Sequence, residues 1–250
     1  MIWPPDNIRI LHVDDDPNFL DVAAELLKRE NERFTVEIVT NPEEGLAMVS
    51  DRPPDCIISD YDMPNMNGVE FLKRVRENRP KLPFILFTSK RRDTVASDAI
   101  SAGVTDYLQK GTESSRYTLL TNRVMNAVKR YECDRRRKRW RQAIDAAVDT
   151  VGIVSADGQY VQLNDAYASV FDTSKADLTG TSWWNWYPDE QVQQFEEEIF
   201  PALQEEGTWR GQVVGQRTDG TQFDQVLSLS SLKGGGHMFV VEEYETGVVD

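Results

Sequence analysis

The sequence predicts two domains of different fold class: an α/β domain with a doubly wound, five-stranded parallel sheet, followed by an α+β domain with an antiparallel sheet. Short apolar runs alternate with longer amphipathic runs through the first 130 residues, and parallel strands need such crossover helices between them. After Asp149 the pattern changes to strand pairs around Asp-Gly turns, which favour tight antiparallel hairpins. The chain of 250 residues is long enough for both domains.

The first domain is expected to contain five strand–helix units. Its expected strands cover residues 8–13, 34–39, 55–59, 83–87 and 104–108, and its expected helices cover residues 17–30, 42–50, 69–79 and 94–102, with a fifth after Thr112. In a doubly wound sheet, ligands bind outside the carboxyl ends of the strands. The residues that directly follow each strand are therefore the first place to look for a site.

One long helix is predicted from Asn122 to about Ala147, because this stretch contains neither Gly nor Pro. Its apolar positions are sparse, and residues 131–142 carry six basic and two acidic side chains. A solvated connecting helix is the preferred interpretation. A coiled-coil segment that joins two copies of the chain, and direct contact with nucleic acid, are the alternatives.

The second domain is expected to begin with one hairpin and to end with another. Its expected strands cover residues 151–154, 159–163, 209–217, 222–232 and 237–243, and its expected helices cover residues 164–171 and 189–205. The resulting domain limits are 6–130 for the first domain, 131–142 for the basic helical linker and 143–245 for the second domain.

The charge distribution argues against nucleic acid and anionic membranes as partners. The formal net charge is −14, and residues 143–250 carry 19 acidic but only four basic side chains, so this region repels polyanions. Such a surface is also typical of proteins from halophilic archaea. No apolar run approaches the roughly 20 residues that span a bilayer, and no signal peptide precedes the first domain. With Cys56 and Cys133 as its only cysteines, the protein is expected in the reducing cytoplasm.

Charged and hydroxyl side chains follow four of the five strands of the first domain. Residues 14–16 are three aspartates after the first strand, Asp60 and Asp62 follow the third, residues 88–89 are Thr-Ser after the fourth, and Lys110 follows the fifth. Carboxylates that converge at one edge of a sheet repel one another and need a cation. An all-oxygen cluster beside one lysine suits Mg²⁺ together with a phosphoryl group.

These segments resemble the response-regulator receiver family. The resemblance rests on residues 13–17 (VDDDP), 59–68 (SDYDMPNMNG), 87–89 (FTS) and 107–110 (YLQK), and it covers roughly residues 6–130. It implies a flavodoxin-like fold and phosphorylation by a partner histidine kinase in a two-component system.

The resemblance implies a role for most of the acidic residues. Asp60 would be the phosphoacceptor and a ligand of Mg²⁺. Asp15 would bind the metal directly, Asp14 would assist, and Asp62 would contribute its backbone carbonyl. Asp16 receives no role.

The resemblance also implies how a phosphoryl group would be held and sensed. Lys110 would pair with the phosphoryl oxygens, and Thr88 would turn its hydroxyl toward them. Tyr107 would follow by rotating inward, and the small Ser89 would keep the approach open. Gly111 stands where the family usually has proline, which makes the lifetime of the phosphoryl group unpredictable.

Residues 143–245 resemble a PAS sensor domain. The resemblance rests on the Asp-Gly turn at 157–158, the helix start at 164–167, Leu-Thr-Gly at 178–180 and the hairpin that begins at Trp209. It implies a small-molecule sensor or a dimerisation module. The ligand is unknown: a cysteinyl-flavin adduct is disfavoured because this region has no cysteine, and haem is disfavoured because its only histidine, His237, begins a strand.

Four aromatic residues gather before the long helix of the second domain: Trp183, Trp184, Trp186 and Tyr187. Aromatic side chains bury large apolar areas, so core packing is the preferred interpretation. A wall on which a ligand stacks is the alternative.

The function that follows is a response regulator that relays phosphorylation of Asp60 through a PAS-like module and has no catalytic output domain. The alternative is the receiver–PAS fragment of a sensor histidine kinase. A kinase needs a phosphoacceptor histidine on a helix, but His12 and His237 both lie on predicted strands. A haloacid-dehalogenase-like phosphatase is disfavoured because Asp60 and Asp62 follow the third strand rather than the first. A DNA-binding regulator is disfavoured by the acidic second domain.

Overall fold

The computed structural model describes residues 7–90, 92–111 and 114–243. They belong to two compact units that divide between Arg136 and Arg137, called here the first unit and the second unit. The domain limits expected at Asp6 and at residue 245, and the helix start expected after Thr112, touch positions outside the described residues. Each unit is built on its own five-stranded sheet.

The first unit has a five-stranded parallel sheet, as the sequence predicts, and its strand order is β2-β1-β3-β4-β5. The strands are β1 (Ile8–Val13), β2 (Phe34–Val39), β3 (Cys56–Ser59), β4 (Phe84–Thr88) and β5 (Asp106–Gln109). The helices are α1 (Pro17–Glu30), α2 (Pro42–Asp51), α3 (Gly68–Asn78), α4 (Arg92–Ser101) and α5 (Ser114–Asp145). β3 and β4 are buried along their whole length, which is typical of parallel strands covered on both faces.

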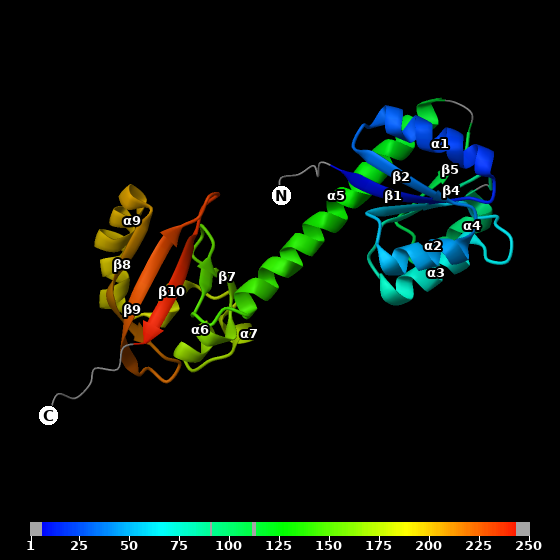
Figure 1. Ribbon diagram of the computed structural model, residues 1–250. Helices are drawn as coiled ribbons and strands as arrows, with labels where there is room; N and C mark the ends of the chain where they lie inside the picture. Colours follow the sequence, from blue (N-terminus) through cyan, green and yellow to red (C-terminus); the bar gives the residue numbers. More distant parts are fainter. Residues whose placement is uncertain (1–6, 91, 112–113, 244–250) are drawn as a thin grey trace. The chain divides into compact units, whose positions relative to one another are not determined.

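Helices cover both faces of this sheet (Figure 1). One hydrophobic cluster joins the sheet to α1 and α5 through residues such as Leu27 and Val124, and the other joins it to α2, α3 and α4 through Val49, Leu72 and Ala99. Both cores lie against the faces of the sheet, and one of them includes Met63 of the loop after β3. The packed layers therefore help to position the loop that carries Asp60 and Asp62.

The helix α5 is longer than either of the two helical stretches expected from the sequence, because it joins them in one run of 32 residues. Its first part packs against the sheet through Leu120, Val124 and Val128. Residues 133–143 are exposed on all sides of the helix, and Trp140 is 67% exposed. This stretch contains most of the basic linker.

The second unit has an antiparallel sheet, again as predicted, and its strand order is β7-β6-β10-β9-β8. The strands are β6 (Gly152–Val154), β7 (Tyr160–Leu163), β8 (Thr208–Gln216), β9 (Gln222–Ser231) and β10 (His237–Glu243). The helical elements are α6 (Asp165–Val170), α7 (Lys175–Leu178), the 3₁₀ helix η1 (Trp183–Trp186), α8 (Asp189–Gln194), the π-helical segment η2 (Phe195–Ile199) and α9 (Phe200–Glu206). The last three follow one another without a break and correspond to the helix expected over 189–205. The sequence did not predict α7 and η1.

Across the described parts of the chain, every helix is too short or too polar to cross a membrane.

Candidate functional site

Three carboxylates meet at the carboxyl edge of the first unit's sheet. β1 and β3 are neighbours, and Val13 lies opposite Ser59, so the next residues, Asp14 and Asp60, lie side by side. With Asp15 they place one carboxylate oxygen each within 4.8 Å of the others. Asp14 and Asp60 are 1% and 5% exposed, whereas Asp15 is exposed. The cluster is therefore mostly shielded but open to solvent on one side.

Lys110 provides the positive charge of the cluster. Its Nζ lies 2.6 Å from Asp14 Oδ2 and 3.0 Å from Asp60 Oδ2, and 4.3 Å from the centre of the Phe19 ring. Burial lowers the pKa of Lys110, but the hydrogen bond to Asp14 and the negative charges of Asp60 and Asp14 outweigh burial, so the pKa is raised. The lysine is therefore a firmly charged ammonium.

The carboxylates outnumber the single ammonium, so the cluster lacks positive charge. Burial is the main cause that raises the pKa of Asp14, against the opposing effect of Lys110. A nearby cation would stabilise the ionised form of a carboxyl group whose pKa is raised by burial. Carboxylate oxygens are the ligands that Mg²⁺ prefers, so the donor set fits this metal.

The loop after β3 is held so that Asp60 points into the cluster. The Tyr61 N–H donates a hydrogen bond of 2.6 Å to Asp60 Oδ1, and the Gly68 N–H donates to the Tyr61 carbonyl at 2.9 Å. A Cβ at Gly68 would lie 2.1 Å from the Asp60 carbonyl oxygen, so only glycine fits. Asn67 starts α3 by a capping box with Glu70. The loop is thereby fixed at both ends.

The ends of β4 and β5 bring the remaining predicted residues to the same edge. Thr88 is fully buried, and its carbonyl accepts a hydrogen bond of 2.8 Å from the Lys110 N–H. Ser89 is exposed. The Tyr107 hydroxyl donates to the Lys90 carbonyl. Thr88 is thus linked to Lys110 through the backbone, whereas the Tyr107 ring contacts the loop after β4.

Asp62 lies outside the carboxylate cluster and forms an ion pair that the sequence did not indicate. Its carboxylate lies 3.0 Å from Lys90 Nζ, and both side chains are about half exposed. Lys90 was missed because an exposed lysine two residues after a strand carries no distinctive pattern.

Asp16, which received no role from the sequence, caps α1. Its carboxylate accepts hydrogen bonds from the Asn18 and Phe19 N–H groups. An aspartate followed by proline at the first helical position is a recognised start signal, so Asp16 could have been identified from the sequence. The cap holds the loop that carries Asp14 and Asp15.

His12 lies in β1 beneath the cluster and is fully buried. Its ring contacts Phe19 and Phe87, and within the described residues neither ring nitrogen has a hydrogen-bond partner. Burial, with a smaller contribution from the charge of Lys110, lowers the pKa of His12 to about 3. The imidazole is therefore neutral and acts as a packed core residue.

The aromatic residues before α8 divide between core and surface. Trp183, Trp186 and Tyr187 are at most 9% exposed, whereas Trp184 is 44% exposed. The His237 ring stacks on Phe200 at 5.1 Å. Core packing thus accounts for three of the four aromatic residues, and Trp184 needs another explanation.

The two units match two different families. Residues 10–121 match the family described as response regulator receiver domain. Residues 144–242 match the family described as PAS fold.

Similar proteins match less than half of the chain. An uncharacterised 14.6 kDa protein of Leptolyngbya boryana is 38% identical over 104 residues, which are 40% of this chain and 77% of that protein. A protein-glutamate methylesterase/protein-glutamine glutaminase of Nocardioides sp. is 34% identical over 105 residues, 41% of this chain and 29% of that protein. The photosynthetic apparatus regulatory protein RegA of Cereibacter sphaeroides is 30% identical over 109 residues, 44% of this chain and 58% of RegA. The chain thus spans less than two thirds of the last two proteins.

Solved structures resemble one unit each. A response regulator receiver domain protein of Clostridium thermocellum covers 50% of this chain and 98% of its own, with 24% identity and a TM-score of 0.46. The PAS domain of a LuxR-family transcriptional regulator from Burkholderia thailandensis, in complex with ethanol, covers 42% of this chain and 96% of its own, with 21% identity and a TM-score of 0.39.

Proposed function

The chain belongs to the response regulator receiver family through residues 10–121 and carries a PAS fold in residues 144–242, and we propose that it is a two-component signalling protein phosphorylated on Asp60 by a partner histidine kinase. The observation that carries this proposal is the position of the Asp60 carboxylate, beside two further carboxylates and 3.0 Å from the Lys110 ammonium. A carboxylate nucleophile in such surroundings suits phosphoryl transfer. We propose no catalytic output beyond the phosphorylation and dephosphorylation of the receiver itself.

Asp60 is proposed as the phosphoacceptor because it is held and oriented. One of its carboxylate oxygens would form the new P–O bond while the P–N bond of the kinase phosphohistidine breaks and its electron pair returns to the imidazole. The hydrogen bond from Tyr61 fixes the carboxylate, and Lys110 lies where it would pair with a phosphoryl oxygen. Both contacts favour an in-line approach of the phosphorus.

Asp14, Asp15 and Asp60 are proposed to hold Mg²⁺, with the backbone carbonyl of Asp62 as a further ligand. The bound metal would neutralise the charge that develops on the transferred phosphoryl group. The side chain of Asp62 faces Lys90 instead, which leaves the backbone as its proposed contribution.

Thr88 and Tyr107 are proposed as the conformational switch, with Ser89 leaving the approach to Asp60 open. The Thr88 hydroxyl would turn toward the phosphoryl oxygens, and Tyr107 would exchange its hydrogen bond with the Lys90 carbonyl for an inward position. New charge-assisted hydrogen bonds would stabilise the altered arrangement. The switch would therefore act on the surface formed by β4 and β5.

The second unit is proposed to receive the signal through α5 and to act as a sensor or a dimerisation module. Residues 133–143 of α5 are exposed on all sides, which leaves them available to a second copy of the chain. The proposed cellular setting is the cytoplasm, where Cys56 and Cys133 would stay reduced; neither forms a disulfide.

The test is phosphorylation of the purified chain with phosphoramidate and Mg²⁺. We expect one phosphoryl group on the wild-type chain and none on the Asp60→Asn variant. Asp62→Asn is the matched control, because its carboxylate lies outside the cluster, and we expect it to be labelled. Equal labelling of the wild-type chain and Asp60→Asn would overturn the proposal.

The Lys110→Ala variant distinguishes two roles of the cluster, namely binding of the metal and the conformational response to the phosphoryl group. We expect this variant to lose more of the conformational response than of its Mg²⁺ affinity, because the carboxylates remain. Hydrogen exchange over residues 131–142, measured with and without phosphorylation, reports that response. Identical exchange in the phosphorylated and unphosphorylated wild-type chain would show that the two units are uncoupled.

A further inference from the structure

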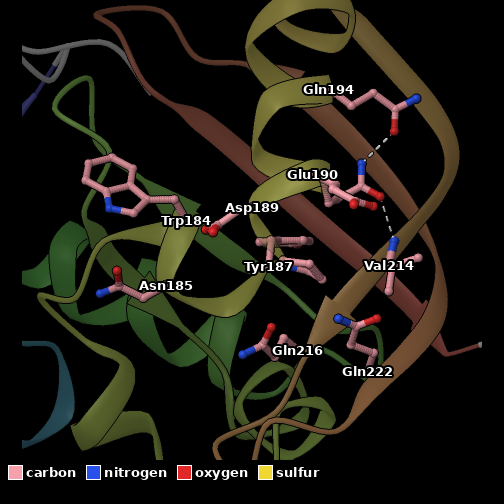
Figure 2. A pocket seen from close by; sticks show the side chains of 11 residues that line it. Trp184, Asn185, Tyr187, Asp189, Glu190, Gln194, Val214, Gln216 and Gln222 are labelled. Carbon is pink, nitrogen blue, oxygen red and sulfur yellow. Dashed lines mark hydrogen bonds between the residues drawn. The ribbon is translucent and has the colours of Figure 1, made fainter.

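The second unit contains a cavity of about 790 Å³, within the size range of small-molecule sites. It lies where the end of η1 and the start of α8 face β8 and β9 (Figure 2). Its lining residues are Trp184, Asn185, Tyr187, Pro188, Asp189, Glu190, Gln191, Gln194, Val214, Gln216 and Gln222. No role proposed above uses this cavity.

The lining of the cavity is polar and acidic. It combines two carboxylates, Asp189 and Glu190, with five carboxamides and two aromatic rings, and none of these eleven described residues is basic. Between Lys175 and Arg210 the sequence contains eight acidic residues and no Lys or Arg. The guanidinium of Arg217, next to the lining residue Gln216, is paired with Asp172 at 3.1 Å. The cavity therefore has a negative potential that favours cations.

One wall of the cavity is rigid. Gln191 is 8% exposed; its amide donates to Gln194 Oε1 at 2.8 Å, and its Oε1 accepts from the Val214 N–H at 2.9 Å (Figure 2). Val214 belongs to β8, an edge strand of the sheet, so Gln191 covers an edge donor that would otherwise need water. The wall is thus formed before any ligand arrives, which reduces the entropy lost on binding.

Trp184 offers a flat aromatic surface at the opposite side of the cavity. It is 44% exposed, and a Cβ at Gly158 would lie 2.5 Å from its ring, so one part of the indole is held against the Asp157-Gly158 turn. Figure 2 shows the indole and the Asp189 carboxylate on the same side of the cavity. An exposed indole and a carboxylate that line the same cavity can both act on an organic ammonium ion, the indole by cation–π attraction.

Tyr187 links the cavity to the interior of the second unit. It lines the cavity but is only 3% exposed, and among the described residues its hydroxyl has no hydrogen bond of normal geometry. The Gln225 carboxamide and the Tyr167 hydroxyl lie close to it. The hydroxyl oxygen itself is buried in that interior, so Tyr187 closes the inner side of the cavity without offering its hydroxyl to a ligand.

We propose that this cavity binds a small organic ammonium ion. Trp184 contacts the cation through its ring, Asp189 and Glu190 supply the counter-charge, and carboxamide oxygens accept hydrogen bonds from the ammonium N–H groups. An anion is excluded by the charge of the lining. A bare metal ion would leave the indole without a function, and a neutral polyol would leave the two carboxylates without a counter-ion.

The experiment is calorimetric titration of the 250-residue chain with putrescine, a diammonium probe. We expect saturable binding with one site per chain. Trp184→Ala and the double variant Asp189→Asn/Glu190→Gln should each weaken binding by about tenfold or more, because each removes a central contact. The matched control is Glu205→Gln/Glu206→Gln, which removes the same charge from α9 outside the lining; we expect its affinity to stay within about twofold.

Three results would overturn the proposal. Absence of saturable binding is the first. Equal weakening by the two double variants is the second, because it would reveal diffuse attraction to an acidic surface. Equal binding of sorbitol is the third, since it would assign the cavity to polyols. Circular dichroism of each variant verifies that the second unit remains folded.

Discussion

The two units place their polar groups in opposite ways on sheets of equal size. In the first unit, Asp14, Asp60 and Lys110 are acidic and basic side chains at the carboxyl edge of a parallel sheet, in contact with one another and open to solvent on one side. In the second unit, Tyr160 and Tyr167 are neutral groups joined by a hydrogen bond of 2.8 Å inside a closed aromatic core. A parallel sheet brings every strand end to one edge, where charges can gather. An antiparallel sheet sends alternate strand ends to opposite edges, so its charges stay dispersed.

The largest effect that we expect from this difference is a loss of stability of the first unit at acid pH. The pKa of His12 is lowered from its ordinary value to about 3 in the folded state by burial. Its contribution to stability is therefore complete above about pH 6.5 and is lost as the pH falls from there towards 3. We expect a loss of about 4 kcal/mol in the free energy of unfolding over this interval.

Calorimetric unfolding of the wild-type chain and of His12→Leu over this pH range measures that loss. The variant cannot take up the proton, so its first unit should depend less steeply on pH. If the stability of the two proteins changed with pH in the same way, His12 would not be the titrating group. The acid sensitivity would then be no evidence for the contrast between the two units.

A backbone contact beneath Asp60 gives the next largest effect. Gly68→Ala places a methyl group 2.1 Å from the Asp60 carbonyl oxygen and 2.9 Å from Leu86, so the loop must move. We expect the first unit to lose about 3 kcal/mol of stability, with the transition of the second unit unchanged.

Gly111→Ala is the matched control for Gly68→Ala, because the three nearest atoms that a Cβ there would meet among the described residues belong to the flexible side chain of Arg116, at 3.1 Å or more. We expect it to change stability by less than about 0.5 kcal/mol. If calorimetry showed equal losses for both alanine variants, tight packing at Gly68 would not be what fixes the loop.

The smallest effect concerns the neutral core of the second unit. Tyr160→Phe removes the hydrogen bond of 2.8 Å between the Tyr160 and Tyr167 hydroxyls, and we expect a loss of about 1.5 kcal/mol. Gln225→Met removes a buried carboxamide that has no hydrogen bond of normal geometry among the described residues. It should be neutral or stabilise the unit by up to about 1 kcal/mol. Urea unfolding of both variants provides the comparison, and a larger loss for Gln225→Met than for Tyr160→Phe would reverse our assignment.

The sequence predicts the first unit well because its signals are local. Continuous apolar runs mark the buried strands, and β1 and β2 have the predicted limits. The strand β5 begins at Asp106 rather than at residue 104, because the Val104 N–H still bonds back to Ala99 at the end of α4. Such a shift depends on the loop geometry, which apolar periodicity does not record.

The second unit is harder to predict because its short elements depend on caps and packing. The helix α7 has only four residues and starts at the Ser174 cap. The 3₁₀ turn η1 buries Trp183 and Trp186 but turns Trp184 outward. Four adjacent aromatic residues look equivalent in the sequence, and only the turn separates them.

The candidate site was predictable wherever a residue directly follows a strand. Asp14, Asp60 and Lys110 could be placed together because strand order and parallel direction determine where their strands end. The ion pair of Asp62 with Lys90 joins two loops through space, and the cavity around Trp184 draws its lining from four elements. Neither has a sequence pattern of its own, so both required the structure.

The central claim is that the strand-end cluster directs phosphorylation to Asp60. The most direct measurement is peptide mapping after the wild-type chain has been treated with phosphoramidate and Mg²⁺ and then reduced with borohydride, which converts an aspartyl phosphate into homoserine. We predict homoserine at position 60, and at no other aspartate. Homoserine at Asp14, Asp15 or Asp62, or a phosphoryl group that resists borohydride, would contradict the account.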